Sequence, residues 1–130
     1  MLLRREFVFD AAHNLTRYHG KCERLHGHTY RVAVILEGDP DEEGMVLDFC
    51  VLSSVVKERA ISVLDHSYIN DTIPQPTAEN IALWIWDQVE GPLARPNCRL
   101  HEVWVWETAS SCAVATAADR AARREGASRQ

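Results

Sequence analysis

The chain has 130 residues, 46% of them hydrophobic and 25% charged, and no break in composition divides it, so we expect one globular domain. Its net charge of -5 argues against nucleic acid as a partner, because proteins that bind a phosphate backbone use clustered lysine and arginine. The sequence also lacks the apolar stretch of a signal peptide or a membrane span, which predicts a cytoplasmic protein without membrane contact, whose four cysteines stay reduced.

Two strands are predicted before residue 39. Residues 2–13 alternate between apolar and polar side chains with a period of two, which is typical of a strand with one buried face. The alternation returns at His26 and ends where Gly38 is followed by aspartate and proline. We therefore expect two antiparallel strands joined by a functional loop, with the polar residues 16–24 in that loop.

Two helices are predicted in the middle of the chain. Asp48 is placed to cap the first helix, whose apolar residues follow three-and-four spacing as far as about residue 65. Thr77 is the expected N-cap of the second helix, because the prolines just before it exclude regular helix. Gly91 and Pro92 are expected to end that helix.

Two further strands are predicted at residues 100–107 and 111–117. The order of elements indicates an α+β protein with a four-stranded antiparallel sheet and two helices on one face. This single domain spans residues 1–117, and residues 118–130 are expected to form a charged, mobile tail. The strand at 100–107 has apolar residues on both faces, Leu100 being expected opposite Val103, and two helices cover only one face of the sheet. The uncovered face predicts an oligomer.

Three histidines form the strongest candidate metal site. His26 and His28 lie two residues apart on a strand, so their side chains point the same way. His13 ends the neighbouring strand on the face that carries its apolar residues, which makes a third imidazole available. Three neutral histidines and one open position are typical of catalytic zinc.

Cys22 lies four residues before the first histidine of this pair. A metal ion and the neighbouring Lys21 would favour its thiolate form, which acts as a base or nucleophile. Two other interpretations stay open. Cys22 is either an inert loop thiol or a fourth protein ligand that closes a structural zinc site.

Two further positions carry candidate acid-base chemistry. Asp65 precedes His66, and an aspartate beside a histidine can orient it for proton exchange. The alternative is an ordinary helix C-terminus with a favourable histidine. Glu107 ends an apolar strand, where a carboxylate needs either a ligand or a structural ion pair.

The loop between the first two strands is basic in an otherwise acidic chain. Arg17, Lys21 and Arg24 lie in it, and Glu23 is its single acid. Such a loop is suited to a small anion, and a solvated loop without a ligand is an equal alternative on charge alone.

These residues occur in segments whose order and spacing resemble the 6-pyruvoyltetrahydropterin synthase family as far as about Ala117. Three residues separate Cys22 from His26, and this spacing resembles that of the bacterial members that form carboxytetrahydropterin. The run from Trp84 to Val89 also resembles those members. Members of the family commonly carry lysine where this chain has Ser53, so the resemblance is incomplete at that position. The matching segments are Phe9-Asp10-Ala11-Ala12-His13, Cys22 to His28, Gly44-Met45-Val46-Leu47-Asp48-Phe49, Leu64-Asp65-His66-Ser67-Tyr68-Ile69-Asn70, Pro76-Thr77-Ala78-Glu79-Asn80 and Trp106-Glu107-Thr108.

The resemblance implies a fold and an assembly. The fold would be the tunnelling fold, or T-fold, in which the sheets of several subunits close into a barrel. The assembly would be a homohexamer made of two trimers, with active sites between subunits.

The resemblance also implies a role for each candidate residue. Cys22, Asp65 and His66 would transfer protons, and Glu107 would hold the pterin as part of the catalytic set. The zinc ligands would be His13, His26 and His28. Further substrate contacts would come from Thr77 and Glu79, with Lys21, Arg24 and Arg17 as candidates for the triphosphate.

The implied reaction converts 7,8-dihydroneopterin triphosphate and water into 6-carboxy-5,6,7,8-tetrahydropterin, acetaldehyde and triphosphate, in queuosine and 7-deazaguanine biosynthesis. Zinc would act in it as a Lewis acid. One alternative is a pyruvoyl-forming or dual-activity member of the family. The other is a non-catalytic zinc- or pterin-binding oligomer in which Cys22 is a metal ligand.

Overall fold

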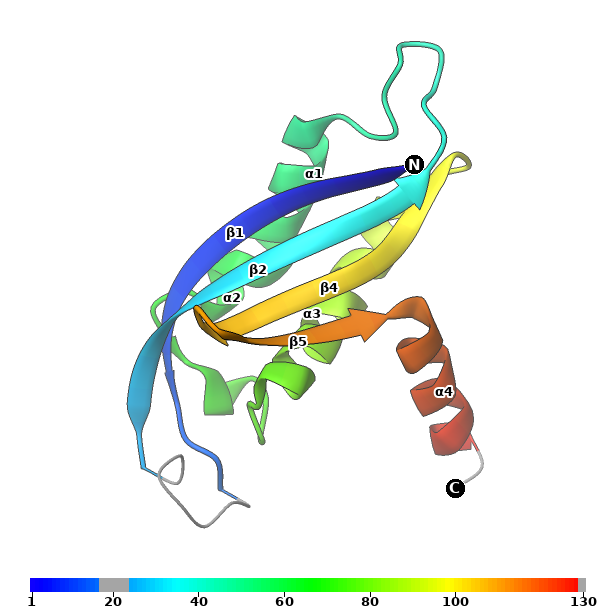
Figure 1. Ribbon diagram of the computed structural model, residues 1–130. Coiled ribbons are helices and arrows are strands. Elements are labelled where there is room, and N and C mark those ends of the chain that lie inside the picture. The colour runs from blue at the N-terminus through cyan, green and yellow to red at the C-terminus, as the bar shows by residue number, and fades with distance from the viewer. Residues whose placement is uncertain (17–23, 129–130) are drawn as a thin grey trace.

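The computed structural model describes residues 1–16 and 24–128, and its sheet has the strand order β3-β1-β2-β4-β5 (Figure 1). The four long strands pair antiparallel, as predicted. The two-residue β3 adds a parallel edge beside β1. The strands are β1 (Leu2–His13), β2 (His26–Gly38), β3 (Ser67–Tyr68), β4 (Cys98–Thr108) and β5 (Ser111–Thr116).

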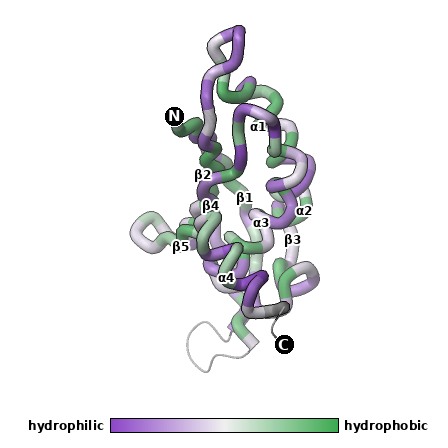
Figure 2. The backbone as a smooth tube through the Cα atoms, turned by 90° about the vertical axis from the view of Figure 1, so that its right-hand side faces the viewer, coloured by the Kyte–Doolittle hydropathy of each residue, from purple (hydrophilic) through white to green (hydrophobic). Residues whose placement is uncertain are grey.

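The helices cover one face of the sheet, so that strands and helices form two layers in the side view (Figure 2). The first predicted helix begins after its N-cap Asp48 and contains one π-helical segment, η2. The second, α3, includes Pro92 in its last turn and so ends slightly later than predicted. Among the described residues, no helix has the length and apolar content needed to cross a membrane. The elements of this layer are α1 (Phe49–Val56), η2 (Lys57–Ile61), α2 (Ser62–Leu64), η3 (Ile69–Asp71) and α3 (Ala78–Leu93).

The core lies between these layers and includes one residue whose predicted face was wrong. Val103 and Val105 of β4 are fully buried against the helices. Leu100 was expected on the opposite face, yet it is buried in the same core. The pairing of β2 with β4 shifts register between Ile35 and Leu36, and such a bulge reverses the alternation of side chains beyond it.

The opposite face of the sheet is covered in part by its own long side chains. The Arg31 guanidinium lies 4.1 Å from the Trp106 ring centroid, and Arg4 lies 5.0 Å from that of Trp104. Hydrogen bonds from Arg31 and then Arg4 lower the pKa of Glu6 to about 2, so that carboxylate is ionised between the two arginines. This face is polar and aromatic rather than simply apolar.

The last element, α4 (Ala117–Ser128), is a helix that the sequence prediction did not include. It packs against α3 through ion pairs, with Arg120 donating to both carboxylate oxygens of Asp87 at 2.7 and 2.8 Å. Arg124 donates to Glu90 at 2.8 Å. Residues 118–128 of the segment expected to be a mobile tail are therefore helical, and the division of the chain at residue 117 stays a prediction.

Candidate active site

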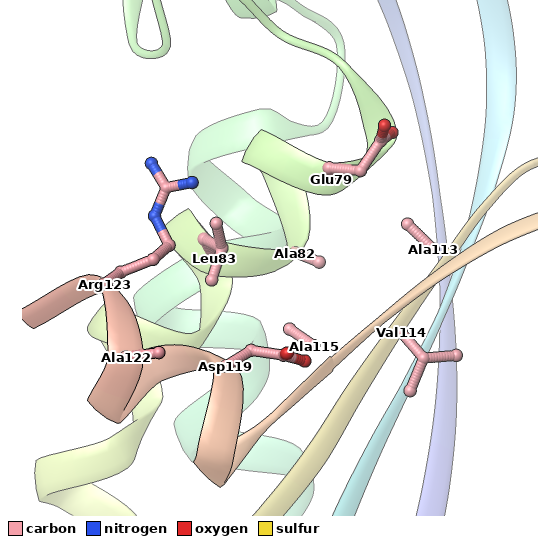
Figure 3. A pocket seen from close by; sticks show the side chains of 9 residues that line it. All are labelled: Glu79, Ala82, Leu83, Ala113, Val114, Ala115, Asp119, Ala122 and Arg123. Atoms are coloured by element: carbon pink, nitrogen blue, oxygen red, sulfur yellow. The ribbon is translucent and has the colours of Figure 1, made fainter. Parts of the chain in front are cut away.

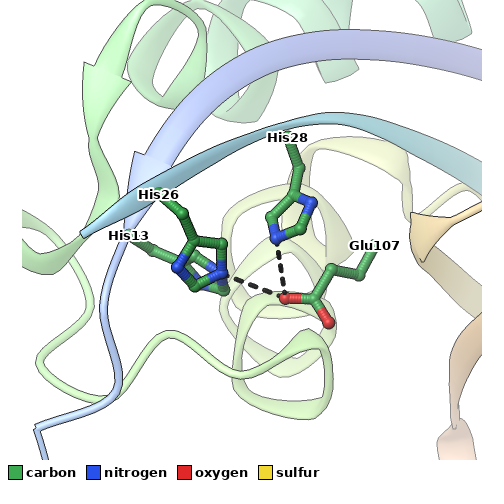
Figure 4. Close-up of side chains that lie close together, drawn as sticks. All are labelled: His13, His26, His28 and Glu107. Atoms are coloured by element: carbon green, nitrogen blue, oxygen red, sulfur yellow. Dashed lines mark hydrogen bonds and ion pairs between the residues drawn. The ribbon is translucent and has the colours of Figure 1, made fainter. Parts of the chain in front are cut away.

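Strand pairing brings the three histidines to one end of the inner face of the sheet, which is the face that packs against the helices (Figure 4). His13 lies opposite His26 in the β1–β2 register, and His28 follows two residues along β2. The Nε2 atoms of His13 and His26 are 3.0 Å apart. The ring centroids of the three histidines lie between 4.5 and 5.2 Å from one another. The single chain therefore places all three predicted ligands together.

Backbone carbonyls determine which nitrogen carries the proton in two of the neutral rings, those of His13 and His26. The Nδ1 atom of His13 lies 2.8 Å from the carbonyl oxygen of Pro76, and that of His26 lies 2.7 Å from the carbonyl oxygen of Arg24. A carbonyl oxygen only accepts hydrogen bonds, so each Nδ1 carries a proton. In the neutral rings both Nε2 atoms therefore have a free lone pair, and these lone pairs face each other.

The third ring, His28, lies partly buried beside the other two. Burial lowers its pKa, an effect that nearby Glu107 partly opposes and that the two neighbouring histidines reinforce. Its Nε2 atom is buried and has no hydrogen-bond partner among the described residues. A buried ring nitrogen of this kind is a candidate ligand atom.

Glu107 reaches the same point from β4. Its Oε1 atom lies 3.0 Å from Nε2 of His13 and 3.4 Å from Nε2 of His28. Glu107 was predicted to contact the pterin and was not predicted to lie beside the histidines. The spacing from Val103 and Val105 was the available signal, because residues two apart share a face of a strand.

This group of residues fits a divalent metal ion. The ligand atoms of His13, His26, His28 and Glu107 lie within 4.8 Å of one another. A single proton cannot satisfy several facing lone pairs, whereas zinc accepts nitrogen and oxygen donors at about 2.0–2.2 Å. The carbonyls behind His13 and His26 are the second-layer partners that commonly orient metal-binding imidazoles.

Asp65 and His66 form a second group, beside β1 at the sheet edge. Asp65 Oδ1 lies 3.0 Å from Nδ1 of His66 and accepts the backbone N–H of Asp10 at 3.0 Å. The Asp10 hydrogen bond is the main reason that the pKa of Asp65 lies below its ordinary value. His66 adopts a φ of 55°, and its side chain is 79% exposed.

The structure does not bring this pair into the histidine and Glu107 group. Asp65 and His66 instead form a separate cluster with Asp10. A cleft of about 600 Å³ runs along the nearby strands and is bordered by both His66 and His28. His66 and the predicted zinc ligand His28 therefore border one cleft, although they belong to separate groups of side chains among the described residues.

The remaining predicted residues occupy different positions. Thr77 caps α3 by accepting the backbone N–H of Asn80 at 3.1 Å. Arg24 is exposed, and its carbonyl orients His26. The predictions for Arg17, Lys21 and Cys22 lie outside the described residues.

Glu79 lies at the border of two clefts next to α3. One, of about 370 Å³, is also bordered by Glu107, Ser111 and Cys112. The other, of about 410 Å³, lies between α3, β5 and α4, with Asp119 on its rim (Figure 3). Glu79 thus lines the cleft that Glu107 borders, and its predicted contact with the substrate stays a prediction.

A family model described as 6-pyruvoyl tetrahydropterin synthase matches residues 2–118. The chain belongs to this family. Its relatives include a Synechocystis protein named 6-carboxy-5,6,7,8-tetrahydropterin synthase, 41% identical over 119 residues, which cover 86% of this chain and 90% of that protein. A Pyrococcus furiosus protein named dihydroneopterin monophosphate aldolase is 38% identical over 99 residues, covering 76% of this chain and 82% of that protein.

A solved structure supports the same family at the level of the fold. The structure of Caenorhabditis elegans 6-pyruvoyl tetrahydropterin synthase matches with a TM-score of 0.80 at 25% identity, covering 89% of this chain and 94% of that chain. The predicted α+β T-fold class is thereby confirmed for the subunit. The three relatives are named for three different reactions, so family membership alone does not select the reaction.

Proposed function

We propose that this chain is a zinc-dependent 6-carboxy-5,6,7,8-tetrahydropterin synthase of queuosine and 7-deazaguanine biosynthesis, acting in the cytoplasm on 7,8-dihydroneopterin triphosphate. The observation that carries the proposal is the convergence of three imidazole Nε2 atoms at the end of the sheet. The 41% identity to a relative of that name favours the carboxy-forming reaction over the alternatives.

His13, His26 and His28 would hold the zinc ion. When bound, zinc supplies Lewis acid chemistry, which makes a proton on a carbon beside a coordinated oxygen easier to remove. The carbonyls of Pro76 and Arg24 keep the His13 and His26 rings in the tautomer that binds metal.

Glu107 would hold the pterin ring. Its two carboxylate oxygens can accept one ring N–H and one amino N–H, as in a bidentate pair with guanidinium. The cleft that Glu107 borders extends toward Glu79 and offers space beside this carboxylate. Thr77 and Glu79 would contact the substrate from the start of α3.

His66 would exchange a proton with the substrate, and Cys22 would take the carbon-bound proton. Asp65 is ionised and accepts the Nδ1 proton of His66, which leaves Nε2 of that ring free to exchange a proton. His66 is exposed and separate from the zinc ligands, which supports a site completed by a neighbouring subunit. We therefore retain the homohexamer of two trimers as part of the proposal.

Lys21, Arg24 and Arg17 would bind the triphosphate. Their positive charge beside the histidines in sequence is the support for this assignment. Replacing Arg24 with alanine should raise KM with little change in kcat, as measured by initial rates. An unchanged KM would remove Arg24 from the triphosphate site.

The reaction is tested by product analysis. The zinc-loaded protein is incubated with 7,8-dihydroneopterin triphosphate, and the products are identified by mass for the wild type and for Cys22→Ala. We expect 6-carboxytetrahydropterin and acetaldehyde from the wild type and neither from the variant. A pyruvoyl product or an aldolase product would reassign the reaction within the family. No turnover with zinc bound would favour the non-catalytic oligomer, especially if Cys22→Ala also lost zinc.

A further inference from the structure

We propose that Glu107 is a fourth ligand of the metal in the resting protein and leaves the metal when the pterin binds. The inference rests on the proposed zinc centre and concerns how that centre is closed without substrate. It gives one side chain two alternative partners, the metal and the pterin ring.

The contacts of Glu107 carry the first part of the inference. Its Oε1 atom is directed at the point where the imidazole rings converge, 3.0 Å from His13 Nε2 and 3.4 Å from His28 Nε2 (Figure 4). Among the described residues, this is the acidic side chain that the histidine group includes. A carboxylate oxygen is a common zinc ligand together with imidazole nitrogens.

The position of the proton on the neutral His13 ring favours a metal cation between its Nε2 atom and Oε1 of Glu107. Its Nδ1 donates to the Pro76 carbonyl, so in the neutral ring Nε2 has no proton to give to Glu107. The 3.0 Å contact would then join two atoms that both carry lone pairs. A metal ion shared by the two atoms converts this repulsion into two bonds.

The backbone at Glu107 is suited to a side chain that changes partner. The register of β4 with β5 shifts between Trp106 and Thr108, which makes Glu107 the extra residue of a β-bulge. Bulges often re-aim a side chain next to a functional site. Glu107 is partly exposed, in contrast to the fully buried Val103 and Val105 of the same strand face. It can therefore turn without disturbing the core.

The cleft of about 370 Å³ offers the second position for this carboxylate. It is bordered by Glu107 together with Glu79, Ser111 and Cys112. A pterin in this cleft would present N–H donors that compete for Glu107. The departure of Glu107 would open one position on the metal, which is the state that catalytic zinc requires.

The test measures metal binding rather than turnover. Zinc affinity is determined by competition with a chromophoric chelator for the wild type, Glu107→Gln and Glu79→Gln. We expect the zinc Kd of Glu107→Gln to rise about tenfold or more, in line with losses at outer partners of metal sites. Glu79→Gln removes a carboxylate from the same cleft and should leave the Kd unchanged.

Cobalt reports on the ligand set directly. In the Co²⁺-substituted protein, the visible d–d spectrum should differ between the wild type and Glu107→Gln but not between the wild type and Glu79→Gln. Adding neopterin to the wild type should shift its spectrum, because Glu107 leaves the metal, whereas the glutamine variant should respond less. Equal zinc affinities and identical cobalt spectra for the wild type and Glu107→Gln would overturn the inference.

Two controls keep this result interpretable. Far-ultraviolet circular dichroism checks that each variant is folded, and Glu107→Asp, whose shorter carboxylate reaches less far, provides a second variant with the same expected direction. If the wild type makes no carboxytetrahydropterin but its zinc affinity depends on Glu107, the proposed function fails and the ligand assignment stands. If the wild type makes carboxytetrahydropterin and its zinc affinity does not depend on Glu107, the proposed function stands and the ligand assignment fails.

Discussion

His13 is fully buried, and its ring is oriented by the carbonyl of Pro76, which lies 63 positions along the chain. The histidines themselves were predictable, because HxH on a strand and a histidine on the paired strand follow from the period of two. The orienting carbonyl was not, since backbone partners depend on how a distant loop packs. The face of β4 on which Glu107 lies could be predicted from its spacing to Val103 and Val105, but its contact with His13 also requires the pairing of β4 with β2.

Removing the His13 side chain should destabilise the protein even without metal. His13→Ala leaves the Pro76 carbonyl without its donor and opens a cavity beside Tyr30. We expect the free energy of unfolding of the metal-free protein to fall by about 1–3 kcal/mol, measured by urea denaturation. The control His101→Ala removes a half-exposed ring and should have little effect. Equal losses in both variants would contradict the role given to the Pro76 hydrogen bond.

The Asp65 carboxylate should make stability depend on acid pH. The hydrogen bond from the Asp10 backbone, with a further one from His66, keeps its pKa below the ordinary value of 3.8. A group with a depressed folded-state pKa contributes stability above its unfolded pKa and loses it as the pH falls through the folded value. The advantage of the wild type over Asp65→Asn should therefore shrink below about pH 4 in urea denaturation. An advantage that grows with acid would contradict this.

At the scale of elements, the strands were predicted better than the last helix. The alternation of apolar and polar residues predicted the bounds of β1 and β2, because side chains along a strand alternate between its two faces whichever strand it pairs with. The same alternation placed Leu100 on the wrong face of the sheet. One bulge between β2 and β4 reverses which face the side chains beyond it occupy, and nothing in the local sequence indicates this bulge. The helix α4 was missed because its charges indicated a solvated tail. Its alanine and arginine content and the partners Asp87 and Glu90 on α3 favour a packed helix.

The N-cap of α3 links helix stability to the candidate metal site. Thr77 accepts the Asn80 N–H and directly follows Pro76, whose carbonyl orients His13. Thr77→Ala should lower the free energy of unfolding by about 1 kcal/mol, and Thr77→Ser should restore most of it. Urea denaturation gives the stability, and initial rates give KM. A raised KM without any loss of stability would show that Thr77 acts on the substrate rather than as a cap.

At the scale of the whole molecule, one chain carries the two halves of the proposed site at separate places. The zinc ligands lie on the inner face of the sheet, whereas Asp65 and His66 lie at its β3 edge. No reading of a single sequence could place these groups relative to each other across subunits. Arg4, Arg31 and the two tryptophans make the outer face a surface that is both aromatic and charged.

A site shared between subunits predicts complementation. His28→Ala and His66→Ala should each be inactive alone, and mixed oligomers made by coexpression should recover about a quarter of the wild-type sites, because random assembly pairs intact halves that often. Mixing His28→Ala with His26→Ala should restore nothing, since both changes affect the same half. No recovery in the first mixture, or a monomer in light scattering, would contradict the shared site.

The most direct measurement of the central claim is the release of acetaldehyde from 7,8-dihydroneopterin triphosphate before zinc removal, after removal by a chelator, and after zinc is restored. The proposed zinc-dependent synthase should release acetaldehyde in the first and third conditions and lose at least most of that activity in the second, while circular dichroism shows the fold intact. An equal rate from the zinc-free protein, or no acetaldehyde in any condition, would contradict it.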